Sequence, residues 1–195
     1  MFNFCPNCAS GKIVFENGKA FRCPDCGFTY YHNVAAATGC VISAPSGAFA
    51  RERDPVASSR ERIMFLVRAK EPALGKLDLP GGFVDIGEGA LEGLHRELRE
   101  EIGWVPPIPP GGSLAEVYAL FASFPNVYLY KGVAYNTCDL YFRLCAPGLR
   151  ETDLTLERSE VSAARFLTPE EIDFEEIAFD STRRAVRAYL SGLRD

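Results

Sequence analysis

One short stretch of the chain, residues 82–104, carries acidic and basic side chains at a spacing that could do chemistry. Its defined positions are Gly82, Glu88, Arg96, Glu97, Leu98, Glu100, Glu101, Gly103 and Trp104. Glu97, Glu100 and Glu101 lie three and four residues apart, so on a helix their carboxylates gather along one stripe. Such carboxylates repel one another, and a hard divalent cation removes the repulsion because Mg²⁺ prefers oxygen ligands. The stretch therefore predicts a divalent-metal site.

The elements that must hold these carboxylates are a helix and the turn before it. Residues 88–102 contain no proline and are rich in Leu, Glu and Arg, which favour a helix. Apolar side chains recur at steps of three and four, which gives one buried face. Residues 79–82, Leu-Pro-Gly-Gly, predict a tight turn where a backbone carbonyl could join the metal shell. We expect Arg96 to pair with Glu88 or a helix carboxylate and to fix its direction.

A Glu-rich helix face also has an ordinary explanation, since a run of charge is usually solvated. An amphipathic helix could contain the pattern E-x-x-E-E by chance. It would rarely also match Gly82, Arg96 and Gly103 at fixed offsets. The complete pattern favours the metal-binding interpretation.

A second group of metal-ligating residues lies near the start of the chain. Cys5-Pro-Asn-Cys8 and Cys23-Pro-Asp-Cys26 are two C-x2-C motifs separated by 14 residues. Two such turns aim four thiolates at one point, which predicts a closed, structural Zn²⁺ site. A redox-active cysteine pair or a disulfide is the alternative. Too few apolar residues surround the motifs for an independent core, so we expect the metal to hold residues 1–33 together as a zinc ribbon.

Length and charge limit the class of protein. The 195 residues are 47% apolar and 24% charged, which is typical of a globular protein with one main core and a small module. The formal net charge of −5 argues against a polyanion as the principal partner, although bound metal ions can attract a small anionic substrate. No stretch resembles a membrane span or a signal peptide, so we expect a cytoplasmic protein without a membrane partner.

Further elements follow from apolar runs and from turn residues. The expected strands are 38–43, 63–67, 114–123, 127–130 and 137–145, with a hairpin tip at Lys131-Gly132. Residues 44–60 predict a long exposed loop, and residues 105–112, with four prolines and two glycines, an irregular connector. Thr168 is expected to begin a helix, and residues 181–193 to form a last amphipathic helix. Strands around one central helix, closed by another, indicate a layered α/β domain.

The motif G-x5-E-x7-R-E-U-x-E-E-x-G-U, with U a bulky apolar residue, is matched at every defined position and is the Nudix box. Together with the preceding zinc ribbon, it resembles bacterial NADH pyrophosphatases and their relatives. The resemblance implies a Nudix α/β/α sandwich with a mixed sheet over residues 34–195, after a small zinc ribbon at 1–33. It also implies a hydrolase that uses Mg²⁺ or Mn²⁺ to cleave a diphosphate joined to a nucleoside.

The same resemblance assigns roles to individual residues. Glu97, Glu100 and Glu101 would bind the divalent metal with help from the Gly81 carbonyl. Arg96 and Glu88 would orient them. Either Glu157 or Glu160, in the late segment E-R-S-E-V, would add a ligand or the general base. Arg68 lies in a run similar to the family's L-x-V-R-A.

The substrate stays open between NAD(H), ADP-ribose and similar compounds. NADH pyrophosphatases carry the signature S-Q-P-W-P-F-P-x-S after the box, and this chain has no tryptophan there. ADP-ribose pyrophosphatases usually place a proline about sixteen residues after the box, where this chain has Leu120. The aromatic-rich stretch 121–141 is where we expect a base to stack, although ordinary strand packing also explains such residues.

A binding protein is the alternative to an enzyme. In it, a catalytically silent Nudix domain would sense a ligand while the ribbon docks nucleic acid or protein. Sensor versions typically lose box glutamates, and here all are present. The ribbon offers Lys12, Lys19 and Arg22 against Glu16 and Asp25, which is no basic patch. We therefore expect a small nucleotide substrate as the partner, with a homodimer contact as one role for the ribbon.

Overall fold

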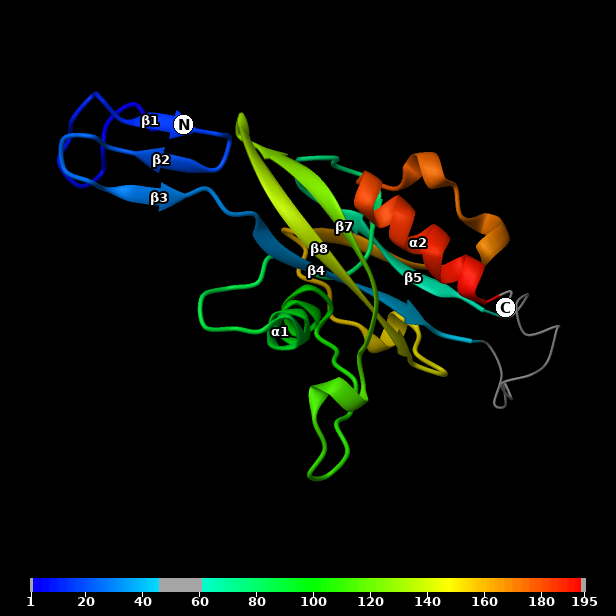
Figure 1. The fold of residues 1–195 in the computed structure, drawn as a ribbon. Helices are drawn as coiled ribbons and strands as arrows, with labels where there is room; N and C mark the ends of the chain where they lie inside the picture. The colour runs from blue at the N-terminus through cyan, green and yellow to red at the C-terminus, as the bar shows by residue number, and fades with distance from the viewer. Residues whose placement is uncertain (1, 46–60, 194–195) are drawn as a thin grey trace. The chain divides into compact units, whose positions relative to one another are not determined.

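The computed structural model describes residues 2–45 and 61–193. The chain divides into two compact units, Met1–Val34 and Ala35–Asp195 (Figure 1). The predicted loop at 44–60 lies outside the described residues, apart from its first two positions. No helix of the described part is long and apolar enough to cross a membrane.

The first unit is a small antiparallel sheet built from short strands. Its strands are β1 (Val14–Glu16), β2 (Ala20–Arg22) and β3 (Thr29–Tyr31), in the order β1-β2-β3. The first two strands are joined by a turn in which Asn17 and Gly18 have positive φ, 52° and 68°. Phe21 is buried on β2 and stacks on Phe15, with ring centroids 4.5 Å apart. Among the described residues of the unit, the buried ones are Cys5, Ala20, Phe21 and Cys23.

The second unit is built on a mixed sheet of six strands. The strands are β4 (Ala35–Ser43), β5 (Ile63–Arg68), β6 (Leu77–Asp78), β7 (Ala119–Tyr130), β8 (Val133–Cys145) and β9 (Val161–Leu167). β8 lies between β4, to which it runs parallel, and β7, to which it runs antiparallel. One edge of β5 pairs with β9. The other edge pairs first with β4, through Ile63 and Ser43, and then with β6, through Leu66 and Val67. The sheet is therefore open between β4 and β5 beyond Ser43.

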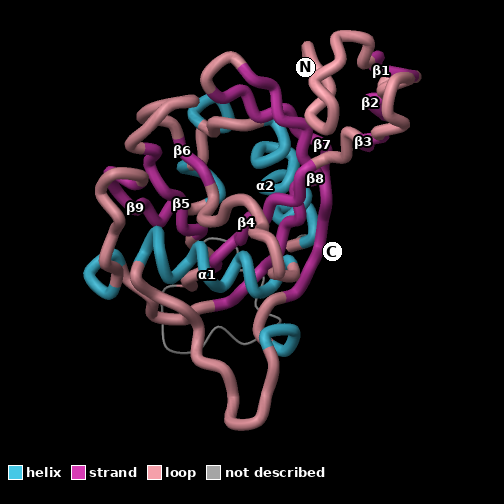
Figure 2. The backbone as a smooth tube through the Cα atoms, turned by 90° about the vertical axis from the view of Figure 1, so that its left-hand side faces the viewer, coloured by secondary structure: helices cyan, strands magenta, loops and turns pink. Residues whose placement is uncertain are grey.

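The two helices cover opposite faces of this sheet. Side chains alternate along a strand, and Ile42 of β4 packs with α1 (Ala90–Ile102) while its neighbour Val41 packs with α2 (Asp180–Gly192). The α1 side buries Leu94, Leu98 and Ile102, as the apolar periodicity predicts. Figure 2 shows the long β7–β8 hairpin running past α2. The result is the α/β/α sandwich with a mixed sheet that the sequence resemblance implies.

The β7–β8 hairpin corrects one part of the strand prediction. Residues 119–130 form a single strand that passes through Pro125, so the expected strands 114–123 and 127–130 are not separate. A proline is tolerated there because β7 is an edge strand. Leu114–Glu116 is a 3-10 turn and not part of a strand. The predicted hairpin tip is confirmed, since Lys131 and Gly132 both have positive φ, 48° and 79°.

The helix boundaries differ from the prediction in two places. The central helix begins at Ala90, two residues later than expected, after an extended Gly89. Thr168 begins only a three-residue 3-10 helix, Pro169–Glu171, in which the Glu171 carboxylate accepts a hydrogen bond from the Thr168 amide at 2.9 Å. The capping pattern is therefore present, but Ile172 returns the chain to an extended conformation. The last helix lies within one residue of its predicted bounds.

Candidate functional site

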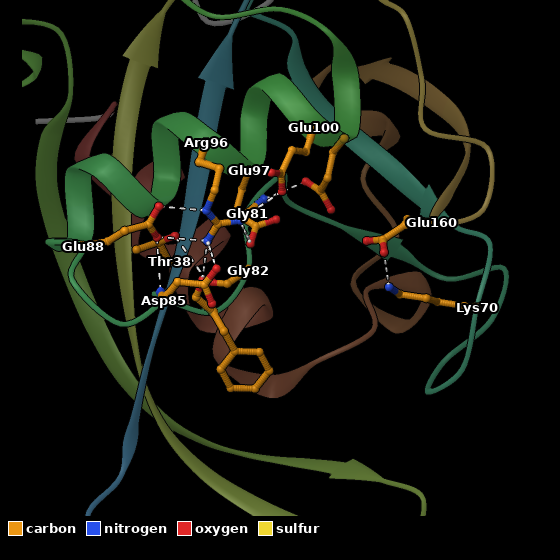
Figure 3. A network of polar contacts seen from close by, with 12 residues as sticks. Thr38, Lys70, Gly81, Gly82, Asp85, Glu88, Arg96, Glu97, Glu100 and Glu160 are labelled. Carbon is orange, nitrogen blue, oxygen red and sulfur yellow. Dashed lines mark hydrogen bonds and ion pairs between the residues drawn. The ribbon is translucent and has the colours of Figure 1, made fainter.

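The loop before α1 lies along β4, where the sheet is open. The Thr38 amide donates to the Gly82 carbonyl at 2.8 Å, and the Cys40 amide donates to the Pro80 carbonyl at 2.9 Å. Gly81 has φ 139°, and a Cβ on it would lie 2.2 Å from the Thr38 carbonyl oxygen. Only glycine therefore fits between this loop and β4. The backbone bonds fix the loop directly under the acidic stripe of α1 (Figure 3).

The second glycine of the loop makes room for a carboxylate. A Cβ on Gly82 would lie 2.6 Å from Oε1 of Glu97, so a larger residue would displace that side chain. The Gly81 amide donates to Oε2 of Glu101 at 2.9 Å. The structure thus joins the loop to α1 at two glutamates. Gly81 makes this contact to Glu101 through its N–H group, whereas the role expected for Gly81 from the sequence is that of its carbonyl as a metal ligand.

Arg96 is the cation at the centre of the acidic stripe. Its Nε donates to Glu88 at 2.8 Å, and its Nη1 contacts Glu97 at 2.8 Å and Glu100 at 3.0 Å. Its Nη2 also donates to the Phe83 carbonyl at 3.0 Å. The hydrogen bond from Arg96 holds the pKa of Glu88 below its usual range. Arg96 therefore matches the charge of Glu88 and holds two helix carboxylates in a fixed direction, as Figure 3 shows.

Glu101 has no such positive partner among the described residues. Burial raises the pKa of its carboxyl well above the usual range, against the effect of the Gly81 N–H group. The negative charges of Glu97, Asp78 and Glu160 raise it further. Burial also raises the pKa of Glu97, although Arg96 opposes the shift. The site therefore holds more negative charge than its arginine can balance.

A hard divalent cation fits this donor set. The side chains of Glu97 and Glu101 are withdrawn from solvent, and Glu100 on the same stripe is exposed, with 59% of its side chain accessible. Carboxylate oxygens are the ligands that Mg²⁺ and Mn²⁺ take, and a cation among them would balance the excess charge. The unbalanced carboxylates are thus better explained by a metal site than by a solvated helix face.

The two candidate acids of the late segment differ in their surroundings. The Glu157 carboxylate accepts hydrogen bonds from the amide and hydroxyl of Ser159, which lower its pKa. Glu160 forms an ion pair with Lys70, and its charge acts on both Glu97 and Glu101. Figure 3 shows Glu160 across from the acidic stripe. Both residues line the same cavity, but Glu160 is the one electrostatically coupled to the buried glutamates.

A cavity of about 710 Å³ extends from the acidic stripe to the α2 side of the sheet. The far end of this cavity was not predicted from the sequence. It is lined by Asp78, Asn126, Thr137, Asp139, Phe179 and Thr182. Arg68 forms an ion pair with Asp78 at 3.0 Å, and its guanidinium lies 5.0 Å from the Phe179 ring centroid. The alternation of polar residues along 137–141 was the available signal, but it resembles any half-buried strand.

The aromatic stretch 121–141 contributes less to the cavity than expected. Of its aromatic side chains, Tyr128 and Tyr141 line the cavity. Phe121 packs against Tyr189 of α2 at 6.0 Å, and Phe124 packs against Tyr141 at 6.2 Å. The alternative of ordinary strand packing therefore describes these phenylalanines. Phe179, which lies outside the stretch, contacts Tyr128 at 5.6 Å and completes an aromatic wall of the cavity.

The four cysteines of the first unit form a compact cluster. The sulfur of Cys5 lies 3.6 Å from that of Cys26, and the sulfur of Cys8 lies 3.7 Å from that of Cys23. All four sulfurs lie within 4.8 Å of one another. Four sulfurs at the Zn–S distance of about 2.3 Å would be about 3.8 Å apart at the corners of a tetrahedron. The cluster therefore fits a Zn²⁺ ion with no position left for a further ligand.

The chain belongs to the Nudix family, because the family model for the NUDIX domain matches residues 55–189. A NAD-capped RNA hydrolase NudC from Chromobacterium violaceum is 30% identical over 100 residues, which cover 51% of this chain and 32% of that protein. An ADP-ribose pyrophosphatase from Methanocaldococcus jannaschii is 36% identical over 66 residues, which cover 34% of this chain and 37% of that protein. The match thus spans about a third of each relative.

Solved structures share the fold at low sequence identity. A NUDIX hydrolase from Nitrosomonas europaea has a TM-score of 0.59 at 20% identity, covering 97% of this chain and 91% of its own. The NUDIX domain of Shewanella oneidensis NrtR, solved with ADP ribose, has a TM-score of 0.57 at 16% identity, covering 82% and 88%. At such low identity these similarities show a shared fold only, and that fold agrees with the α/β/α sandwich.

Proposed function

We propose that this chain is a Mg²⁺- or Mn²⁺-dependent hydrolase that cleaves the diphosphate linkage of a nucleoside diphosphate derivative. The observation that carries the proposal is the gathering of Glu97, Glu100 and Glu101 beside Arg96, in the wall of a cavity large enough for a nucleotide. Two relatives are named for ADP-ribose and for NAD-capped RNA. Both names denote an adenosine diphosphate joined to a second group.

Glu97, Glu100 and Glu101 would hold the divalent cation, with the Gly81 carbonyl as a further oxygen ligand. When bound, the cation would act as a Lewis acid on the phosphate oxygens and stabilise the charge on the leaving phosphate. Arg96 and Glu88 position the metal-binding carboxylates through the contacts at 2.8 Å and 3.0 Å. The Gly81 N–H group holds Glu101 from the opposite side.

Glu160 is the residue that we assign as the base. It faces the acidic stripe across the cavity, and its ion pair with Lys70 holds its carboxylate in place. One water molecule would lose a proton to Glu160 and attack a phosphorus of the P–O–P linkage. The bond to the bridging oxygen breaks, and two monophosphates leave. Glu157 is the weaker candidate because the hydrogen bonds from Ser159 lower the pKa of its carboxyl, which makes it a weaker base.

The four-cysteine cluster is proposed to bind one structural Zn²⁺ ion, which makes residues 1–33 a zinc ribbon ahead of a Nudix domain at 34–195. The sulfur spacing supports this assignment, and the closed ligand set keeps the ion out of the chemistry. The ribbon then serves stability or contact with a second copy of the chain.

The test of the proposed function is a comparison of kcat/KM for ADP-ribose, NADH and 8-oxo-dGTP at equal Mg²⁺. We expect a diphosphate derivative to be preferred, with AMP as one product. A triphosphate preferred by tenfold or more, about 1.4 kcal/mol of transition-state stabilisation, would show that the substrate class is wrong. Binding of ADP-ribose without any turnover would instead favour the ligand-sensing alternative.

A further inference from the structure

The strand β8 presents two buried polar atoms to the far end of the cavity. Thr137 and Asp139 lie two residues apart, so their side chains point to the same face of the strand. Both line the cavity, at exposures of only 3% and 7%. β8 is an inner strand, paired with β4 and β7 along its length at these positions. Their side chains therefore start from a rigid backbone.

These two side chains carry unpartnered atoms in an otherwise paired network. Oδ2 of Asp139 accepts a hydrogen bond from Ser181 at 2.7 Å, and the Tyr141 hydroxyl donates to Ser181 at 3.0 Å. Oδ1 of Asp139 and Oγ1 of Thr137 have no hydrogen-bond partner in the described part of the chain. Buried polar atoms are nearly always paired, so two such atoms in one cavity wall point to a ligand.

The atom types define what that ligand must offer. A carboxylate oxygen such as Oδ1 of Asp139 accepts hydrogen bonds, so the partner that fits it is an N–H or O–H donor. The Thr137 hydroxyl either donates or accepts, and it can pair with an acceptor beside that donor. The nearby wall of Tyr128 and Phe179 suits a flat aromatic ring. The combination fits the edge of a nucleobase with an amino group next to a ring nitrogen.

We propose that Asp139 and Thr137 recognise the exocyclic amino group and the adjacent ring nitrogen of an amino-bearing nucleobase, of which adenine is the example. This inference rests on the proposed function, since it places the diphosphate at the acidic stripe and the base at the α2 side of the cavity. A base with a carbonyl oxygen at the same position, such as hypoxanthine, would set lone pairs against Oδ1 of Asp139. The site thus selects amino over oxo bases.

The experiment measures binding of AMP and IMP by calorimetry, at saturating Mg²⁺, to wild-type protein and to Asp139→Asn. Neither monophosphate contains a diphosphate that the proposed reaction could cleave. AMP should bind at least about fivefold more tightly than IMP to the wild type, because a mismatched buried group loses its hydrogen bond. In Asp139→Asn the amide can donate to the hypoxanthine oxygen, so the preference should vanish or reverse. Thr137→Val, which keeps the volume, should reduce the preference to a smaller extent.

A matched control is Asp153→Asn, since Asp153 pairs with Arg150 on the surface and does not line the cavity. It should leave the AMP-to-IMP ratio unchanged. Equal affinities in the wild type, or no binding of either nucleotide, would overturn the inference even if Asp139→Asn failed to fold. So would a preference that persists in a folded Asp139→Asn protein. In either case, ordered water would be the partner of Oδ1 of Asp139 and Oγ1 of Thr137.

Failure of the proposed function can be told apart from failure of this inference. Binding of a monophosphate needs no turnover, so the AMP-to-IMP ratio can be measured on a protein that cleaves nothing. A preference for AMP without hydrolysis of any diphosphate would contradict the enzyme and keep the base site. Hydrolysis of ADP-ribose and its hypoxanthine analogue at equal kcat/KM would contradict the base site and keep the enzyme.

Discussion

The two clusters of metal-ligating residues in this molecule differ in how completely their geometry is set. In the first unit, four sulfurs already stand at distances of 3.6 and 3.7 Å that match a tetrahedral ion. In the second unit, Arg96 contacts Glu88, Glu97 and Glu100, whereas within the described residues the hydrogen bond to Glu101 comes from the Gly81 N–H group. A closed set of soft ligands suits a structural ion, whereas unbalanced hard ligands beside a cavity suit a cation that meets substrate.

The two clusters have opposite effects on the stability of the metal-free protein. The cysteine cluster stabilises a unit that has little apolar core of its own. The glutamate cluster destabilises the metal-free domain, because buried carboxylates of raised pKa face one another. Removal of a ligand should therefore harm folding in the first unit and harm chemistry in the second.

The largest expected effect is on turnover. Glu101→Gln preserves volume but removes one metal-binding charge, and kcat/KM on the preferred substrate should fall by about 100-fold or more. Steady-state kinetics at saturating Mg²⁺ measure the loss. Glu92→Gln is the control, since Glu92 is exposed on the same helix and does not line the cavity. Unchanged kinetics in Glu101→Gln would contradict a catalytic role for the acidic stripe.

A smaller effect on turnover is expected from Glu88→Gln. This residue acts through Arg96, so its loss loosens the glutamates without removing a metal ligand. Residues that orient metal ligands typically contribute about 10- to 100-fold in affinity or activity. In a titration of activity with Mg²⁺, Glu88→Gln should need a higher Mg²⁺ concentration for half-maximal activity and should have a lower kcat. An effect larger than that of Glu101→Gln would reverse the assigned roles.

The cysteine cluster should be separable from the chemistry. Metal analysis should find about one Zn²⁺ per chain, and Cys23→Ser should lose it and unfold the first unit. Cys145→Ser is the matched control, because Cys145 is exposed at the end of β8. Hydrolysis of a small substrate by the second unit should change by no more than about twofold, since a closed site offers no position for substrate. Fully folded wild-type protein without zinc would exclude the structural assignment.

The smallest expected effect is on the melting temperature of the metal-free protein. The folded pKa of Glu101 is raised, so its contribution to stability is present below the unfolded pKa of about 4.3 and is lost as pH rises through the folded pKa. In chelator at pH 8, Glu101→Gln should therefore melt above the wild type, by about 2–4 °C for about 1 kcal/mol. Saturating Mg²⁺ should remove this advantage. A lower melting temperature in chelator would show that Glu101 stabilises the fold.

The order of strands and helices, together with the resemblance to the Nudix family, was sufficient to predict the fold class. Residue spacing was sufficient to predict which cysteines and which glutamates lie together. Two C-x2-C motifs specify a common point, and glutamates at steps of three and four specify a helix stripe. The hairpin tip at Lys131 and Gly132 was predicted for the same reason, since two-residue turns depend on local backbone preferences.

The far end of the cavity could not be predicted, because its residues meet only in the folded chain. Asp78 pairs with Arg68 from β5 and with Thr182 from α2, which is 104 positions away. The partner of Asp139 is Ser181, and no local pattern links the two. The helix expected at Thr168 forms only as a three-residue 3-10 helix, for a related reason. Its capping pattern is local, but packing of Ile172 into the α2-side core ends it after one turn.

The dependence of the reaction on a divalent metal is measured by the hydrolysis of ADP-ribose before and after removal of that metal. Protein is treated with a chelator that strips Mg²⁺ and Mn²⁺ while metal analysis confirms that zinc remains at about one per chain. The proposal predicts that release of AMP falls by about 100-fold or more and returns when Mg²⁺ or Mn²⁺ is restored. Turnover that persists at full rate in the chelator, with zinc alone in the protein, would contradict it.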